Sequence, residues 1–279
     1  MSKQAVEIEH LLELVSVTDP KISPDGKRAV FVQTKMDEED NTYYSHVHHI
    51  SLETGETTPW TYGTSRNSQP AWSADGRHIA FLSDRSGKNQ LHVLPASGGE
   101  ARAVTDFEKG VSSFRWSPCN KKIWVNALVQ DGKTLMDAES KDEGEEKKPE
   151  PYRTTIMKYK MDGNGLVKQD YHRQIGSVDL ETEKVEQLTE GPYHFGLEAI
   201  SHDGTKLVYG SAKEENQDCV FRQSLYMRHL ETGEDTAIIE QDGYYGDAIF
   251  SFDDAHLAFV GQSRTYENAT HTQLYVYEA

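Results

Sequence analysis

The decapeptide SPDGKRAVFV, residues 23–32, has a near copy in SADGRHIAFL, residues 73–82. Three more diverged copies follow, which are SPCNKKIWVN from 117, SHDGTKLVYG from 201 and SFDDAHLAFV from 251. The serines that open the five copies are spaced by 50, 44, 84 and 50 residues. A period of about 40–50 residues is typical of a β-propeller with one four-stranded blade per repeat. The spacing therefore predicts an all-β propeller of about five blades.

The local chemistry of the repeat fits a turn followed by a covered strand. Ser-Pro-Asp-Gly suits a type I turn, because proline presets φ at the second position and glycine accepts a positive φ at the fourth. The apolar runs that follow, such as RAVFV and HIAFL, lack strict alternation of polar and apolar residues. Inner strands that are covered on both faces have this pattern.

A second repeated element follows each of these turns. Its copies are HVHHISLETGET, QLHVLPASGGEA, GSVDLETEKVEQLT, SLYMRHLETGED and QLYVYEA. Each copy combines a strand with a tight turn and, except in the last, a short further strand, so it predicts the hairpin of the third and fourth strands. The Ser-to-Gly turn must then join the first and second strands of each blade.

These elements divide the chain into predicted segments. Apolar residues at Ile8, Leu11, Leu12 and Val15 predict an amphipathic helix of about three turns, within an N-terminal cap of residues 1–17. The first blade would begin near Thr18. The predicted blades within the partial propeller, residues 18–279, are 18–63, 68–107, 111–191 with an insertion at 131–170, 196–242 and 246–279.

The third repeat contains the insertion. Residues 137–151, DAESKDEGEEKKPEP, hold seven acidic and three basic residues, which predicts a solvated loop. Residues 152–166, YRTTIMKYKMDGNGL, predict an inserted hairpin that closes at 162–165. We expect the insertion between the second and third strands of one blade. A decayed sixth blade is the alternative.

The fifth repeat reaches Ala279 after three predicted strands. An unfinished blade leaves backbone groups unpaired, so we expect the propeller to be incomplete and the chain to be part of a longer protein. The alternative is a small five-bladed propeller whose N-terminal segment completes the last blade.

Composition limits the partners and the compartment. The formal net charge of −17 repels phosphate backbones, which argues against nucleic acid. Two cysteines, Cys119 and Cys219, are too few for a disulfide scaffold. The first residues do not resemble a signal peptide, and no run of about 18 apolar residues occurs. We expect a cytoplasmic protein that does not bind membranes.

No catalytic constellation is visible. The near misses to the nucleophile motif G-x-S-x-G, at 63–67, 110–114 and 261–265, lack the closing glycine. Residues 131–134, DGKT, imitate a P-loop, but Ala127 stands where its first glycine is needed. We therefore assign no catalytic residue and no cofactor, and the substrate-binding residues are unknown.

Several smaller motifs favour structural roles. His46 and His48 would share one strand face and form the best metal candidate, but no carboxylate lies at a useful spacing, so we expect no metal site. Ser83–Arg85 is expected to close a strand rather than to bind a ligand. The tyrosine pairs at 43–44 and 244–245 are expected mostly in blade packing. The sequon NAT, 268–270, is expected to be accidental.

The chain resembles the N-terminal part of acylaminoacyl-peptidases and related bacterial enzymes of the prolyl oligopeptidase family. The resemblance rests on residues 11–33, on 70–106 and on YKMDGNGL at 159–166, followed by VEQLTEGPYHFG at 185–196. The YKMDG piece is the most specific, whereas SPDG and LSDR also occur in TolB-like propellers of many functions. The resemblance covers essentially the whole chain.

This resemblance implies the propeller of a serine peptidase whose α/β-hydrolase domain, with its Ser, Asp and His, is absent from the 279 residues. No catalytic residue can be transferred, and the chain alone is expected to be inactive. The implied role is to admit short peptides to the missing active site and to exclude folded proteins. A homo-oligomer is left open. A stand-alone TolB-like binding propeller and a metal-dependent oligogalacturonate lyase are the alternatives.

Overall fold

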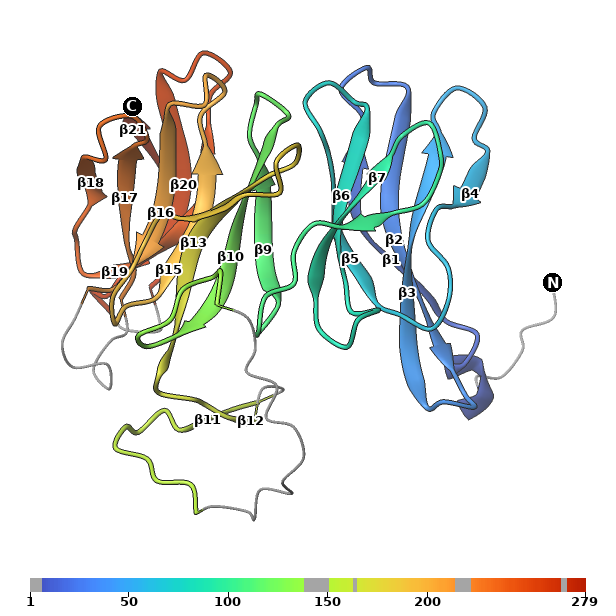
Figure 1. The fold of residues 1–279 in the computed structure, drawn as a ribbon, viewed down its shortest axis with the longest axis horizontal. Coiled ribbons are helices and arrows are strands. Elements are labelled where there is room, and N and C mark those ends of the chain that lie inside the picture. Colours follow the sequence, from blue (N-terminus) through green and yellow to red (C-terminus); the bar gives the residue numbers. More distant parts are fainter. Residues whose placement is uncertain (1–6, 138–150, 163–164, 214–221, 267–269) are drawn as a thin grey trace. The chain divides into compact units, whose positions relative to one another are not determined.

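The computed structural model of the protein describes residues 7–137, 151–162, 165–213, 222–266 and 270–279. The chain folds as two compact units, residues 1–106 and 107–279, and antiparallel strands make up nearly all of the regular secondary structure that is described in both (Figure 1). The all-β prediction is confirmed. Across these described ranges, no helix has the length and apolar character needed to cross a membrane.

The first unit contains two four-stranded sheets, in which each strand pairs with the next along the chain. The strands of the first sheet are β1 (Val15–Ile22), β2 (Arg28–Asp37), β3 (Thr42–Ser51) and β4 (Thr57–Pro59). Those of the second sheet are β5 (Asn67–Trp72), β6 (His78–Ser83), β7 (Gln90–Pro95) and β8 (Arg102–Ala103).

The described part of the second unit contains three further sheets of three or four strands, besides a two-stranded ribbon. The third sheet has β9 (Val111–Trp116), β10 (Lys122–Gln130), β13 (Tyr171–Asp179) and β14 (Val185–Gln187). The fourth has β15 (Phe195–Ile200), β16 (Lys206–Ser211), β17 (Ser224–His229) and β18 (Asp235–Ile239). The fifth has three strands among the described residues, β19 (Gly243–Phe250), β20 (His256–Ser263) and β21 (Gln273–Glu278).

The insertion lies between the second and third strands of the third sheet, because β10 pairs directly with β13. Its described part contains a two-stranded ribbon, β11 (Lys160–Met161) and β12 (Gly165–Leu166). Residues 138–150, which include nearly all of the acidic run, lie outside the described residues. No further four-stranded sheet occurs in the described part of the insertion.

The N-terminal helix is shorter than the sequence predicts. A single 3-10 helix, η1 (Ile8–Leu11), replaces the expected three turns, and none of its residues is buried. The strand β1 already begins at Val15, three residues before the predicted start of the first blade. A short helix is marginal in water unless its apolar stripe packs against something, and here the apolar side chains of Ile8 and Leu11 are exposed.

The Ser-to-Gly turn has the predicted place and a specific hydrogen-bond network. The Ser23 hydroxyl accepts the Arg28 N–H at 3.0 Å and donates to the Asp25 carboxylate. The Ser23 N–H donates to the Arg28 carbonyl at 2.8 Å, and Gly26 takes a φ of +71°. The serine therefore ties the end of the first strand to the beginning of the second.

The same corner is built in the other sheets with some substitutions. Ser73, Ser201 and Ser251 each donate to the aspartate two residues later and accept the N–H five residues later. Cys119 replaces the aspartate in the third sheet, where its sulfur lies 3.3 Å from the hydroxyl oxygen of Ser117. Asn120 and Asp254 replace the glycine and still adopt a positive φ, of +58° and +56°.

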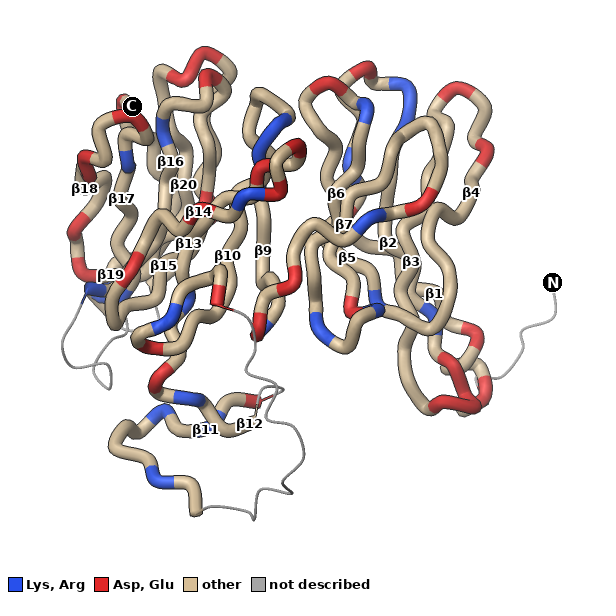
Figure 2. Tube along the Cα trace, in the orientation of Figure 1, with Lys and Arg blue, Asp and Glu red and all other residues tan. Residues whose placement is uncertain are grey.

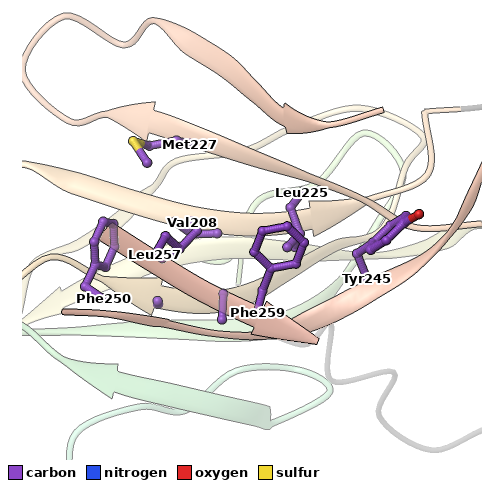
Figure 3. Packing of buried hydrophobic residues seen from close by; sticks show 9 residues of the cluster. Val208, Leu225, Met227, Tyr245, Phe250, Leu257 and Phe259 are labelled. Atoms are coloured by element: carbon purple, nitrogen blue, oxygen red, sulfur yellow. The ribbon is translucent and has the colours of Figure 1, made fainter. Parts of the chain in front are cut away.

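Within each unit, neighbouring sheets bury apolar side chains against each other. Figure 3 shows the cluster between the fourth and fifth sheets, where Leu225 and Met227 of β17 face Phe250, Leu257 and Phe259. Each fully buried aliphatic side chain of this kind stabilises the fold by roughly 1.5–3 kcal/mol. Similar clusters join the first sheet to the second and the third to the fourth.

Replacing the buried Ser201 by alanine should lower the free energy of unfolding by about 1–3 kcal/mol, because the Lys206 N–H loses its hydroxyl acceptor and the Asp203 carboxylate loses a donor. Urea unfolding of the chain measures the loss. Ser86→Ala, at an exposed loop serine, is the matched control. Equal losses in the two variants would contradict the proposed role of the corner.

Candidate functional site

The histidines singled out as a metal candidate lie on β3 and take part in packing. The ring of His48 stacks on Phe31 with centroids 5.5 Å apart. Burial lowers the pKa of both His46 and His48, which favours neutral imidazoles. Within the described ranges, no three His, Cys, Asp or Glu side chains come close enough together to hold a metal ion.

The Ser83–Arg85 segment forms local hydrogen bonds. The Asp84 carboxylate accepts the backbone N–H of Arg66 at 2.7 Å. The Arg85 guanidinium donates to the Ser83 hydroxyl at 3.0 Å and to the Asn67 side-chain oxygen at 3.3 Å. These bonds hold the end of β6 against the loop that precedes β5, which is the strand-closing role expected from the sequence.

The tyrosine pairs divide between core and surface. Tyr245 is fully buried in the cluster between the fourth and fifth sheets, whereas Tyr43 and Tyr244 are exposed. The Tyr44 hydroxyl donates to the Asp40 carboxylate. Packing therefore explains Tyr245 but not the two exposed rings. The sequon at 268–270 lies mostly outside the described residues.

A polar cavity of about 480 Å³ opens in the second unit at the base of the insertion. It lies where β10 ends, where β13 begins and where the chain crosses from β14 to β15. Its lining consists of residues 129–134, His172, Gln174, Gln187 and 190–192. The P-loop imitation, 131–134, forms one wall of this cavity and follows a strand rather than preceding a helix.

A carboxylate–imidazole pair stands at this cavity. The Asp131 carboxylate lies 2.8 Å from Nδ1 of His172, whose side chain is mostly buried. The ring of His194 lies 5.4 Å away between centroids, and its Nδ1 accepts the Arg173 N–H at 3.0 Å. The arrangement fixes the orientation of the His172 ring, but no serine, threonine or cysteine nucleophile is hydrogen-bonded to it in the described structure.

The cavity walls are held by buried amide and hydroxyl groups. The Gln174 amide donates to the carbonyls of Gly191 and Tyr193, and its oxygen accepts the Thr189 hydroxyl at 2.8 Å. That hydroxyl oxygen also accepts the Ile175 N–H at 2.8 Å. These bonds satisfy the wall groups internally and hold the connection from β14 to β15 against β13.

Asn126 connects the third sheet to the fourth beside this cavity. Its buried amide donates to the carbonyls of Gln174 and Phe195, at 2.9 Å and 3.0 Å. Its side-chain oxygen accepts the Leu197 N–H at 2.6 Å. One side chain thereby fixes the first strand of one sheet against the inner strands of its neighbour.

The outward face of the fifth sheet is apolar and exposed. Its residues occupy the positions that, on the fourth sheet, pack against the fifth sheet. Equivalent positions are found by counting from the turn serines and by following the strand pairing. On the fourth sheet these positions are buried, with Leu225 at 0% exposure; the set is Ala199, Val208, Leu225 and Met227. On the fifth sheet they are Ile249, Ala258, Leu274 and Val276, and Leu274 is 71% exposed.

Two sequence families match the chain. The TolB β-propeller domain matches residues 12–148. The acylaminoacyl-peptidase N-terminal β-propeller domain matches residues 119–278, which is more than half of the chain. The chain belongs to the acylaminoacyl-peptidase N-terminal β-propeller family. This assignment confirms the resemblance stated from the sequence and the TolB-like propeller fold.

Relatives of this acylaminoacyl-peptidase propeller are longer proteins. The chain is 35% identical over 226 residues to the uncharacterized peptidase YuxL of Bacillus subtilis, covering 81% of the chain and 34% of YuxL. The acylaminoacyl peptidase of Pyrococcus horikoshii superposes with a TM-score of 0.71 at 20% identity, over 97% of this chain and 39% of that one. A putative TolB from Agrobacterium tumefaciens gives a TM-score of 0.60 at 15% identity, over 94% and 77%. The chain thus spans about a third of the length of YuxL.

Sequence reasoning missed the cavity residues of this propeller. The sequence indicates Asp131 only as part of a P-loop imitation, and it gives no signal for His172. The two side chains lie 41 positions apart in the chain and meet only through the pairing of their strands. A usable signal existed for Thr189, since threonines occur at the matching place in three repeats. Thr61, Thr105 and Thr189 each accept the N–H of a buried third-strand residue.

A second polar cluster at the base of the insertion gives a pH-dependent prediction. The Tyr171 hydroxyl donates to the Glu108 carboxylate at 2.7 Å, and Lys109 and Lys133 lie within 3.4 Å of it. These groups lower the pKa of Glu108 from 4.5 to about 2. Because this carboxyl is more acidic in the folded state, its stabilising effect is present above pH 4.5 and is lost as the pH falls toward 2.

Tyr171→Phe should raise the pKa of Glu108 toward its ordinary value, since the variant removes the strongest donor, and should move the acid-induced loss of stability to higher pH. Titration of the Glu108 carboxyl by NMR measures the shift directly. Tyr266→Phe, at an exposed ring, should leave it unchanged. A Glu108 pKa that is the same in both variants would contradict this account.

Proposed function

We propose that the chain is the non-catalytic propeller of a serine-type acylaminoacyl-peptidase or oligopeptidase, and that it controls the access of short peptides to an α/β-hydrolase domain. The observation that carries the proposal is the match of residues 119–278 to the propeller domain of acylaminoacyl-peptidases. A relative described as a peptidase supports it, because that relative is longer and leaves room for a catalytic domain.

The chemistry of the chain supports a non-catalytic role. The G-x-S-x-G motif does not occur in its 279 residues. The near-miss serines Ser65, Ser112 and Ser263 lie in or beside antiparallel strands and not at a strand-to-helix turn. A nucleophile with its base and oxyanion donors must therefore come from the rest of the longer protein.

The uncovered face of the fifth sheet supports a role inside a larger propeller. Its exposed apolar positions are the ones that hold two sheets together elsewhere in the second unit. An exposed apolar patch that is continuous with an unpaired edge strand favours association over permanent solvation. Further sheets of the longer protein would cover it and extend a rigid wall that passes extended peptides and stops folded proteins.

A stand-alone binding propeller is the second candidate. The TolB propeller match over residues 12–148 favours it, because that family is defined by the fold and not by a peptidase domain. In that case the polar cavity and the exposed faces would bind a protein partner. For either candidate we expect a cytoplasmic location, since two cysteines are too few for a disulfide scaffold.

The test compares the purified chain with the longer protein that contains it. The chain should not hydrolyse acetylated or free peptides, whereas the longer protein should cleave short acetylated peptides and slow steeply as their length increases. In the longer protein, Asn126→Ala should reduce this dependence on length, because it removes the hydrogen bonds that fix the third sheet to the fourth.

The exposed Asn89→Ala is the matched control and should keep the dependence on peptide length. Circular dichroism of both variants distinguishes a folded variant with a weaker contact between the third and fourth sheets from a variant that fails to fold. Hydrolysis by the rigorously purified chain would contradict the non-catalytic role. A longer protein that cleaves the same acetylated end equally fast on a short peptide and on a folded domain would contradict the gating role.

A further inference from the structure

The polar cavity at the base of the insertion has the size of a small-ligand site. Its volume of about 480 Å³ lies within the range of roughly 300–1,000 Å³ that is usual for such sites. All of its lining residues belong to the second unit and to the described part of the chain. The chemistry of the lining side chains then decides which kind of molecule fits.

The side chain of His172 contributes a hydrogen-bond acceptor to the cavity wall. This residue lines the cavity and is only 9% exposed. Its Nδ1 lies 2.8 Å from the Asp131 carboxylate, which can only accept a hydrogen bond, so Nδ1 carries the proton of the neutral ring. Nε2 is then left as an acceptor, and it has no hydrogen-bond partner among the residues that the structure describes.

Two carboxylates add acceptors and negative charge to the same cavity. The Asp131 side chain is 57% exposed, and one of its two oxygens bonds to His172. Glu190, on the connection from β14 to β15, is exposed, and its carboxylate has no hydrogen bond or ion pair within the described ranges. The ammonium of Lys133, the lysine of the lining, lies 3.4 Å from the Glu108 carboxylate, so its charge is already paired.

The polar donors of the lining are engaged within the protein. Gln130, Gln174 and Gln187 each donate a side-chain amide hydrogen to an oxygen of the chain, and the Thr134 hydroxyl donates to the Asp137 carboxylate. Figure 2 shows many acidic positions along the loops of the sheets, in a chain whose formal net charge is −17. Acceptors and negative charge therefore dominate what the cavity offers, and the wider field also attracts a cation.

We propose that this cavity binds a primary ammonium group, carried by the free amino end of a short peptide or by a lysine-type side chain. A primary ammonium has three N–H donors and a positive charge, which match Nε2 of His172 and the carboxylates of Asp131 and Glu190. An acetylated amino end has no such charge, so the cavity distinguishes free from blocked ends. The inference goes beyond the proposed peptidase function and stands independently of it.

NMR titration of the 279-residue chain with triglycine and with acetyl-triglycine tests the proposal. Triglycine should bind with a dissociation constant of roughly 1 mM, as expected for so small a ligand. Acetyl-triglycine should bind at least about tenfold more weakly, because it lacks the ammonium. The backbone N–H signals of Gly132 and Gly191, which line the cavity, should shift during the titration.

The amide of Nα-acetyl-lysine separates the two sources of the ammonium group. Weaker binding than that of triglycine would assign the site to free peptide ends. Equal or tighter binding would assign it to lysine-type side chains. Either result supports a primary-ammonium site.

Glu190→Gln should weaken the binding of triglycine roughly tenfold, because it removes one of the two carboxylates of the cavity. Asp131→Asn should also weaken it, and this variant keeps an oxygen that accepts the His172 N–H. Glu231→Gln, at an exposed glutamate outside the cavity lining, makes the same change in charge and should leave the affinity unchanged. Circular dichroism confirms that the three variants fold.

Four outcomes would overturn the proposal. The first is that none of the three ligands binds. The second is equal affinity for triglycine and acetyl-triglycine, which would show that the ammonium is not recognised. The third is equal weakening by Glu190→Gln and Glu231→Gln, which would indicate net charge and not the cavity. The fourth is binding that leaves the signals of Gly132 and Gly191 unshifted, which would locate the site elsewhere.

Discussion

The serine corner between the first and second strands is the constraint on which the rest of the structure depends. A hydroxyl that binds both the turn aspartate and the N–H five residues later fixes where the second strand begins. The pairing of that strand with its neighbours then decides which side chains point to either face of the sheet. Because the corner recurs, the same positions face the neighbouring sheet in each repeat.

The repeated register explains why the sheets stack and why one face is left uncovered. Val208 pairs with Met227 in the fourth sheet, as Ala258 pairs with Val276 in the fifth. The first pair is buried by the next sheet, and the second pair faces outward from the last sheet of the second unit. In a propeller, each sheet presents the face that the next sheet needs until the ring is complete.

The sequence predicted the features that depend on local chemistry. The turn at Ser23 and the strand after it follow from residues close together in the chain, and the register of each hairpin follows from the turn. The three-turn helix was wrong, because its apolar spacing could not reveal that Val15 belongs to β1. The pair of Asp131 with His172 and the bonds of Asn126 could not be foreseen, since they join residues 41 to 71 positions apart.

The most direct test of this account compares alanine substitutions at two equivalent positions, Leu225 and Leu274. In the 279-residue chain, Leu225→Ala should cost about 2–5 kcal/mol of unfolding free energy, whereas Leu274→Ala should cost less than about 0.5 kcal/mol. In the longer protein proposed above, the two costs should become similar, because the proposal places a further sheet over Leu274. A Leu274→Ala variant that remains neutral in the longer protein would contradict the central claim.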